Sequence, residues 1–153
     1  MATNARTETE LEGITLPAGE YFMSDPCYVL GSNDKKADPS NPLYDPKWWA
    51  VLDAIENEDD GSYNGAYTKD GLTAVIFSTD HGDGVYYDNY RRRYGVDAGM
   101  IGIIPVAMAT RTDYLGQVGD MFQRAKFAQP FTCSSNDGVL RFGTIRIDTG
   151  WTR

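Results

Sequence analysis

A chain of 153 residues with 41% hydrophobic residues is long enough to form one domain with a buried core. Its 22 Asp and Glu residues outnumber the 14 Lys and Arg residues. The net charge of −8 disfavours nonspecific binding to long nucleic acids, because that binding depends on neutralising phosphates. No apolar run approaches the roughly 20 residues that cross a bilayer. Because the first residues also lack the apolar centre of a secretory signal, we expect a cytoplasmic protein with no membrane partner.

The chain divides into a short tail and one domain. Residues 1–12 are polar and acidic without periodicity, so we expect them to be disordered. Residues 13–153 are expected to form a single β-rich domain. Its first strand-like segments lie at 20–23 and 27–30, and Pro26 separates them because proline cannot donate a hydrogen bond within a sheet.

One helix is predicted near residues 46–57, after a loop-like stretch rich in Pro, Asn, Asp and Ser. An Asp-Pro pair can cap its start. Trp48, Leu52 and Ile55 recur at helical spacing, so one face of the helix should pack against a sheet. Acidic residues follow, which are unfavourable near a helix C-terminus, and the helix is expected to end by Asn57.

The rest of the chain has the pattern of short β-strands. Asp70-Gly71 and Asp137-Gly138 have the signature of two-residue hairpin turns. Residues 140–148 alternate as a half-buried strand does, and residues 112–123 are predicted to be a short helix or a loop. Short spacing without helical crossovers favours antiparallel pairing. We therefore predict a mainly β (α+β) fold, a compact antiparallel sandwich or barrel of short strands with one covering helix.

Two cysteines, Cys27 and Cys133, could form at most one disulfide, and neither belongs to a CxxC motif. Since His81 is the only histidine, one chain has too few ligands for a structural zinc site. We expect two free thiols, no metal and no cofactor.

The densest group of polar, aromatic and cationic residues lies between residues 78 and 105. Arginine side chains bind phosphate with two parallel hydrogen bonds, and tyrosine rings stack on bases, so this group favours a small anionic nucleotide as ligand. The chain has no P-loop and no Rossmann glycine motif. Other cations could join the same face, but the sequence does not place Arg111, Arg124, Lys126, Arg141 or Arg146. The residues predicted to bind the ligand are His81, Asp83, Tyr86, Tyr90, Arg91, Arg92 and Arg93.

Three other interpretations of this segment stay open. A hydrolase could use His81 with Asp80 or Asp83, although neighbours along one turn rarely converge as a Ser-His-Asp triad does. The aspartates could bind calcium, but their spacing differs from that of an EF-hand and no closing glutamate follows. The run Arg91–Arg93 could also be a solvated charged loop. We expect no catalytic residue in the chain.

Three segments carry a resemblance to a known family. They are SDPCYVL at 24–30, DHGDGVYYDNYRRRYGVDAGMIGIIP at 80–105 and GVLRFGTIRIDTGW at 138–151. They resemble a family of small, largely uncharacterised bacteriophage and prophage proteins with a GDPCYVL-like first strand, a GDGVY turn and a DSGxIGIIP strand. Ser24 stands where that family has Gly, and Ala98 where it has Ser. The resemblance covers about a third of the chain and implies a phage origin and a β fold.

Phages encode small nonenzymatic proteins that blunt host immunity. One class, the nucleotide sponges, sequesters signalling nucleotides without cleaving them and needs a β framework, an oligomer interface and Arg/Tyr loops. By this analogy, we expect a homo-oligomeric, nonenzymatic sponge for a small nucleotide signal. The alternatives are a virion-associated or structural β protein and a small hydrolase using His81.

Overall fold

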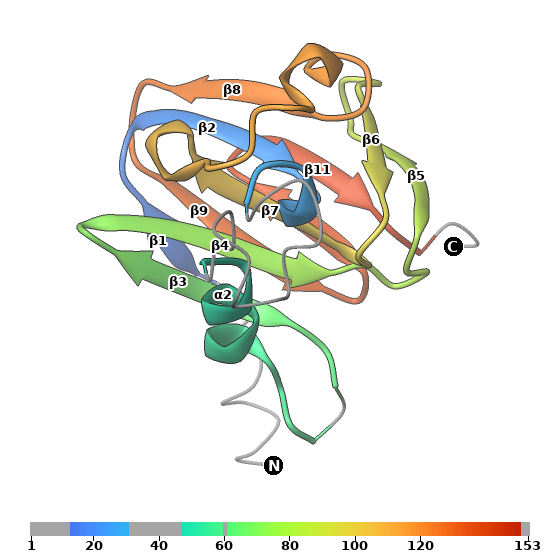
Figure 1. Ribbon diagram of the computed structural model, residues 1–153. Coiled ribbons are helices and arrows are strands. Elements are labelled where there is room, and N and C mark those ends of the chain that lie inside the picture. The colour runs from blue at the N-terminus through green and yellow to red at the C-terminus, as the bar shows by residue number, and fades with distance from the viewer. Residues whose placement is uncertain (1–12, 31–46, 60, 151–153) are drawn as a thin grey trace.

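The computed structural model describes residues 13–30, 47–59 and 61–150, and for residues 47–49 it describes the backbone alone. The described residues contain eleven strands, one α-helix and three short 3-10 helices (Figure 1). The strands are β1 (Ile14–Leu16), β2 (Gly19–Ser24), β3 (Asn64–Lys69), β4 (Leu72–Ser78), β5 (Gly84–Tyr87), β6 (Arg93–Val96), β7 (Met100–Pro105), β8 (Gln123–Phe127), β9 (Phe131–Asn136), β10 (Val139–Phe142) and β11 (Ile145–Asp148). The helices are α2 (Lys47–Ile55), η1 (Pro26–Tyr28), η2 (Val106–Met108) and η3 (Leu115–Gln117).

The strands form three antiparallel sheets. A five-stranded sheet has the order β3-β4-β7-β2-β8, and a four-stranded sheet has the order β1-β9-β10-β11. The hairpin β5-β6 forms the third sheet and lies at one side of the other two (Figure 1). All strand pairs within them are antiparallel. The predicted mainly β fold of short strands with one covering helix is confirmed.

The central strands of the five-stranded sheet are buried on both faces, because the sheet separates two hydrophobic cores. All six residues of β7 are buried, which explains its uninterrupted apolar sequence. Successive side chains of a strand point to opposite faces, so Tyr21 and Met23 enter one core while Phe22 enters the other. The first core lies between the sheets and includes Val75, Phe77, Ile101, Ile103, Leu140, Phe142 and Ile147. The second includes Tyr28, Leu30, Val51, Ile55, Ile76, Ile104 and Phe122.

The two predicted Asp-Gly turns are confirmed, and the hairpin β10-β11 was not predicted. Asp70 and Asp137 have φ of 55°, and the glycines that follow have φ of 80° and 81°, as a type I′ turn requires. Residues 140–148 form two strands rather than the single predicted strand. Gly143 takes φ of 63°, and Phe142 pairs with Ile145 across the turn. The two exposed turn residues, Gly143 and Thr144, shift the buried positions from Leu140 and Phe142 to Ile145 and Ile147, so one uninterrupted alternation does not run through this segment.

The strand predicted at 27–30 is wrong, because η1 occupies this position. The Asp25 carboxylate accepts a hydrogen bond from the Cys27 backbone N–H at 3.0 Å, and Pro26 stands in the first turn. The same carboxylate accepts bonds from the backbone N–H groups of Asp97 (2.8 Å) and Ala98 (2.6 Å). A side chain that caps a turn in this way competes with extended structure.

Helix α2 covers the edge of the five-stranded sheet near β3 (Figure 1). Val51 and Ile55 are buried there, whereas Leu52 is only half-buried. The face of the helix that packs against the sheet is therefore centred on Val51 and Ile55, slightly rotated from the predicted face, which included Leu52. The side chain of Trp48, the proposed Asp-Pro cap and the tail 1–12 lie outside the described residues.

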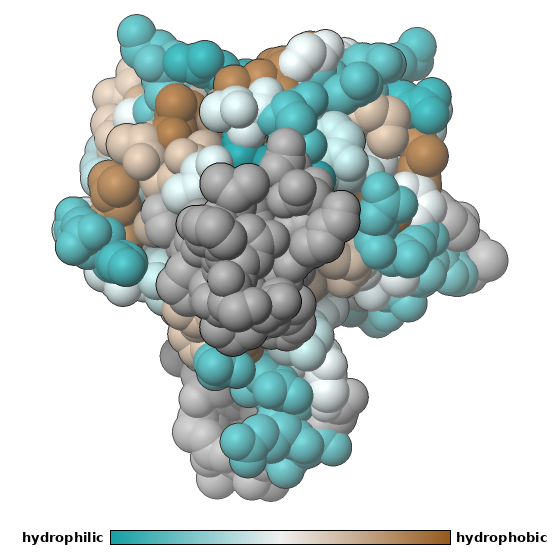
Figure 2. Space-filling view, in the orientation of Figure 1, coloured by the Kyte–Doolittle hydropathy of each residue, from teal (hydrophilic) through white to brown (hydrophobic). Residues whose placement is uncertain are grey.

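Residues 112–123, predicted to be a short helix or a loop, contain the 3-10 helix η3 and are otherwise loop up to β8. None of the helices in the described residues is long and apolar enough to cross a membrane. On the face shown in Figure 2, hydrophobic residues appear as small separate patches among hydrophilic ones. The large hydrophobic side chains that are exposed in the described part of the chain are Tyr87, Tyr90 and Leu115.

Candidate functional site

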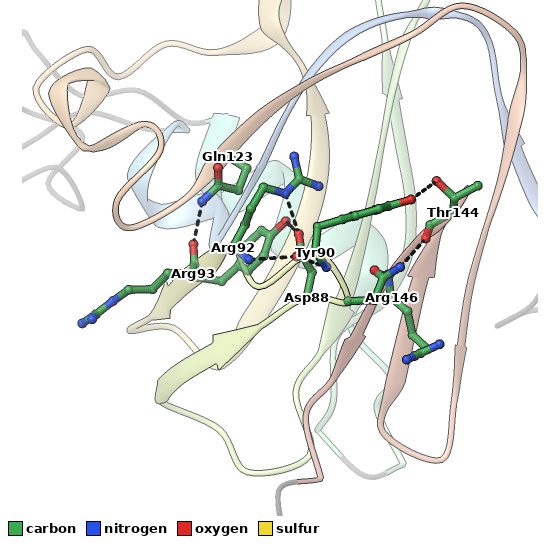
Figure 3. A network of polar contacts seen from close by, with 9 residues as sticks. Asp88, Tyr90, Arg92, Arg93, Gln123, Thr144 and Arg146 are labelled. Carbon is green, nitrogen blue, oxygen red and sulfur yellow. Dashed lines mark hydrogen bonds and ion pairs between the residues drawn. The ribbon is translucent and has the colours of Figure 1, made fainter.

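The turn that joins β5 to β6 is built around one buried carboxylate. Asp88 has a fully buried side chain, and its Oδ1 accepts backbone N–H bonds from Tyr90 (2.8 Å) and Arg92 (3.0 Å). Its Oδ2 accepts bonds from Arg92 Nε (2.9 Å) and the Tyr94 hydroxyl (2.7 Å) (Figure 3). Four donors compensate the cost of burying this charge. The turn is therefore held in one conformation by its own sequence.

The same turn is fastened to the four-stranded sheet. Asn89 Oδ1 accepts the Arg146 backbone N–H at 2.7 Å, and the Asn89 side-chain amide donates to the Thr144 carbonyl at 3.0 Å. The Tyr90 hydroxyl lies 3.1 Å from the Thr144 hydroxyl (Figure 3). These contacts fix the Tyr90 ring over the β10–β11 turn while leaving 55% of the residue exposed.

The three consecutive arginines do not point into one site. Arg92 lies beside the Tyr90 ring, with its guanidinium carbon 5.4 Å from the ring centroid. Arg93 extends away from Tyr90 and Thr144 (Figure 3), and its backbone carbonyl accepts a bond from Gln123 Nε2. Arg91 is exposed and takes φ of 67°, an unusual value for a residue with a side chain. Of the three, only Arg92 lines the groove described next.

An open groove of about 460 Å³ lies between this turn, the free edge of β8 and the β10–β11 turn. Its volume is within the usual range for small-molecule sites. Among the described residues, the groove lining has three cationic side chains, an exposed tyrosine ring and a threonine hydroxyl, and none of these lining residues is acidic. The lining residues are Tyr90, Arg92, Arg124, Ala125, Lys126, Phe127, Thr144 and Ile145.

The two groove arginines have acidic partners that differ in accessibility. Arg92 is paired with Asp88, which lies beneath the groove and is inaccessible to solvent. Arg124 is paired with Glu20 at 3.3 Å, and both side chains are 47% exposed. An exposed pair of this kind contributes little to stability, about 0–1 kcal/mol, so an anionic ligand can replace Glu20 at small cost.

Tyr86 does not have the predicted role in stacking on a base. The residue is 1% exposed, it packs in the core between the sheets, and its hydroxyl donates to the Gly82 carbonyl at 2.7 Å. Burial raises its pKa above the usual value, and burial together with the hydrogen bond to Asp88 raises the pKa of Tyr94. Tyr86 is therefore a core residue, because side chains on this strand alternate between the core and the surface.

His81 and Asp83 do not share the groove with Tyr90 and Arg92. Both are exposed and lie in the turn before β5, at the opposite end of the β5-β6 hairpin from the turn at 88–92. Four residues of extended strand separate the two turns, or roughly 13 Å at the usual rise. The seven residues predicted as one site are thus divided among the groove, the core, and other surface positions.

Arg124, Lys126 and Thr144 are the groove residues that sequence reasoning did not assign. Residues 123–127 are far from the arginine run in sequence, and only the pairing of β8 with β2 brings them to this edge. The alternation of charged and uncharged residues in QRAKF indicates one charged face, but it does not say which neighbour that face meets.

Among the described residues, no three His, Cys, Asp or Glu side chains lie close enough together to hold a metal ion. The groove is chemically suited to hold an anion with an aromatic part. No family model matches this chain, and neither a curated protein nor a solved structure shows significant similarity to it.

Proposed function

We propose that this protein binds a small phosphate-bearing ligand of the nucleotide type in the groove and does not change it chemically. The observation that carries the proposal is the combination of three cations, an exposed tyrosine ring and no acid in one groove of suitable volume. Arginine suits this task because its planar guanidinium offers two parallel donors to a phosphate.

In this proposal each groove cation and the tyrosine ring have a distinct part in binding. Asp88 holds Arg92 through Nε, so a phosphate can approach the two Nη nitrogens. Arg124 can exchange its exposed partner Glu20 for a phosphate, and Lys126 adds a third positive charge. Tyr90 supplies the stacking ring. Because its hydroxyl is already bonded to Thr144, the ring loses little conformational freedom when a base stacks on it.

The resemblance to phage proteins supports sequestration as the biological role, and a phage nucleotide sponge that counters host immunity remains our leading hypothesis. Sequestration requires tight binding rather than turnover, which a groove of donors and a stacking ring can provide. The homo-oligomer expected of a sponge is a separate prediction, which light scattering after size-exclusion chromatography tests. A cytoplasmic location stays a prediction as well.

The test is calorimetry with a panel of AMP, ADP-ribose and cyclic di- and trinucleotides, preceded by a thermal-shift screen. We expect at least one of these to bind the wild type and to be recovered unchanged after heat denaturation. The double variant Arg124→Ala, Lys126→Ala should bind it at least tenfold more weakly. One lost charge-assisted hydrogen bond is worth about 1.5–3 kcal/mol, and tenfold is about 1.4 kcal/mol.

The matched control is Lys69→Ala, which removes an exposed cation from β3, the opposite edge of the same sheet. This variant should bind the nucleotide as the wild type does. Equal affinity in the groove variant and the wild type would refute the groove assignment. If no nucleotide binds, the structural-protein alternative is favoured, and conversion of a nucleotide that is lost in His81→Ala would favour the hydrolase.

A further inference from the structure

A second pocket, which shares no residue with the groove, lies where η1, the end of β6 and the segment around η3 meet. Its volume is about 340 Å³, and its lining residues are Tyr28, Asp97, Tyr114, Gln117 and Met121. The proposed nucleotide function does not use any of them.

The walls of this pocket are aromatic and thioether groups. The rings of Tyr28 and Tyr114 lie with centroids 4.9 Å apart and planes tilted by 50°, and Tyr28 also stacks on Phe122 at 5.9 Å. Met121 packs against Gly95, where a Cβ atom would come within 2.0 Å of the Met121 Cε atom. The glycine at position 95 therefore gives the methionine the space to form one side of the pocket.

The carboxylate of Asp97 lines the same pocket, and hydrogen bonds hold this residue in place. Asp97 accepts a hydrogen bond from the Tyr28 hydroxyl, and the backbone of residues 97 and 98 is fixed by the buried Asp25 carboxylate. Burial, together with the bond to Asp97, raises the pKa of Tyr28, so the phenol stays neutral and remains the donor.

In the described part of the chain, the arginine beside the pocket is Arg111, and it is already engaged. Arg111 lies over the Tyr114 ring, 4.6 Å from its centroid, and donates to both oxygens of Asp113 at 3.0 and 3.2 Å. Its Nη1 donates to the Cys27 carbonyl at 2.7 Å. Among the described residues that line the pocket, Asp97 is charged and none is cationic.

We propose that this pocket binds a small organic cation, namely an ammonium group that carries methyl or methylene substituents. The faces of tyrosine rings attract cations, because the ring quadrupole places negative charge there. The methionine thioether adds a polarizable apolar contact for the substituents. The Asp97 carboxylate, at the hydroxyl end of the Tyr28 ring, supplies the counter-charge, and it would repel the anion proposed for the groove.

The experiment is calorimetry with choline, compared with its neutral isostere 3,3-dimethylbutan-1-ol, which has the same shape without the charge. We expect choline to bind and the neutral alcohol to bind at least about fivefold more weakly, since ring and carboxylate interactions both require the charge. The variant Asp97→Asn keeps the size of the side chain and an acceptor for Tyr28, and its affinity for choline should fall by a similar factor. Tyr114→Leu should weaken choline binding as well.

The matched control is Asp83→Asn, an exposed aspartate in the turn before β5, which should bind choline as the wild type does. The groove variant Arg124→Ala, Lys126→Ala should also retain choline binding, so this site and the nucleotide site can fail separately. Absence of saturable choline binding by the wild type would overturn the proposal. Equal binding of choline and the neutral alcohol would overturn it too. If Asp97→Asn does not fold, Tyr114→Leu and the neutral isostere decide the matter.

Discussion

The basic groove and the acidic pocket are built from the same kinds of side chain but have opposite charge. Each is associated with a tyrosine hydroxyl bonded to an aspartate: Tyr94 to the buried Asp88 beneath the groove, and Tyr28 to Asp97 in the pocket lining. Each also has an arginine over a tyrosine ring. The sign of the charge that each site presents therefore depends on which of these groups faces the cavity.

In the groove the carboxylate is buried beneath the turn, and the arginine Arg92 lines the cavity. In the pocket the carboxylate Asp97 lines the cavity, and Arg111 is occupied by Asp113 and a backbone carbonyl. The comparison shows that composition sets which groups are present, whereas burial and hydrogen bonding set which of them a ligand meets.

The largest effect is expected from Asp88→Ala, because the aspartate is buried and carries four hydrogen bonds. Removing one partner of a buried ion pair typically costs 3–5 kcal/mol, so the free energy of unfolding should fall by about this amount. Urea denaturation measures it. The control is Asp113→Ala, which removes an arginine-paired carboxylate that is 34% exposed, against 0% for Asp88, and should cost under about 1 kcal/mol. Similar losses in the two variants would remove the distinction between the buried and the accessible pair.

The two free thiols provide a second comparison, because one lies between the sheets and the other beside the acidic pocket. Burial raises the pKa of Cys133 from 9.0 to about 12, which lowers its thiolate fraction near neutral pH by about a thousandfold. Burial, and then the nearby Asp25 carboxylate, raise the pKa of Cys27 as well.

Alkylation by iodoacetamide at pH 8, followed by mass spectrometry, should therefore be slow at both thiols in the native protein and fast after unfolding in urea. Rapid modification of native Cys133 would contradict its burial. A Cys27–Cys133 disulfide would contradict the structure, since the two residues belong to different cores.

The variant Tyr90→Ala tests whether the groove uses its ring. Loss of stacking on a base is worth about 1–3 kcal/mol, so nucleotide affinity should fall by about 5- to 150-fold. Tyr87→Ala is the matched control, because Tyr87 is equally exposed, at 54%, but does not line the groove. Choline binding should be the same in both variants. If the two variants lose nucleotide affinity to the same extent, a general surface effect rather than stacking explains the result.

The smallest effect is expected from salt. A tenfold rise in ionic strength should weaken nucleotide binding several-fold, because the groove lining carries three positive charges and is open to solvent. Choline binding should weaken by less, since a single carboxylate attracts it. Titrations of the same protein sample at low and high salt make the comparison, and a steeper dependence for choline would reverse the assignment of charge to the two sites.

Much of the fold could be predicted from local sequence. The Asp70-Gly71 and Asp137-Gly138 turns follow from backbone preferences of two adjacent residues, and the β7 strand from a continuous apolar run. The prediction failed where side chains override periodicity. The Asp25 side chain caps residues 26–28, which form η1 in place of a strand. The turn at Gly143 divides one apparent strand into β10 and β11.

The candidate sites were predictable only in part. The sequence identified Tyr90 and Arg92 as parts of a binding loop, because exposed tyrosines and arginines in a turn suit a nucleotide. It did not distinguish them from Tyr86, which is buried in the preceding strand β5, or from Arg93, which points away from Tyr90 and Thr144 (Figure 3). Neighbours of one type along a chain reach different environments, since a strand directs alternate side chains to opposite faces.

The sequence by itself thus determined the β class, the helix and the Asp-Gly turns, because these depend on φ preferences and on the spacing of residues close together in the chain. Tertiary structure determined that Arg124 and Lys126 meet the turn at 88–92, and that Asp88 is buried while Asp97 faces a pocket. These features depend on which strands pair and which faces pack together. They arise from contacts between residues tens of positions apart, which local propensity does not encode.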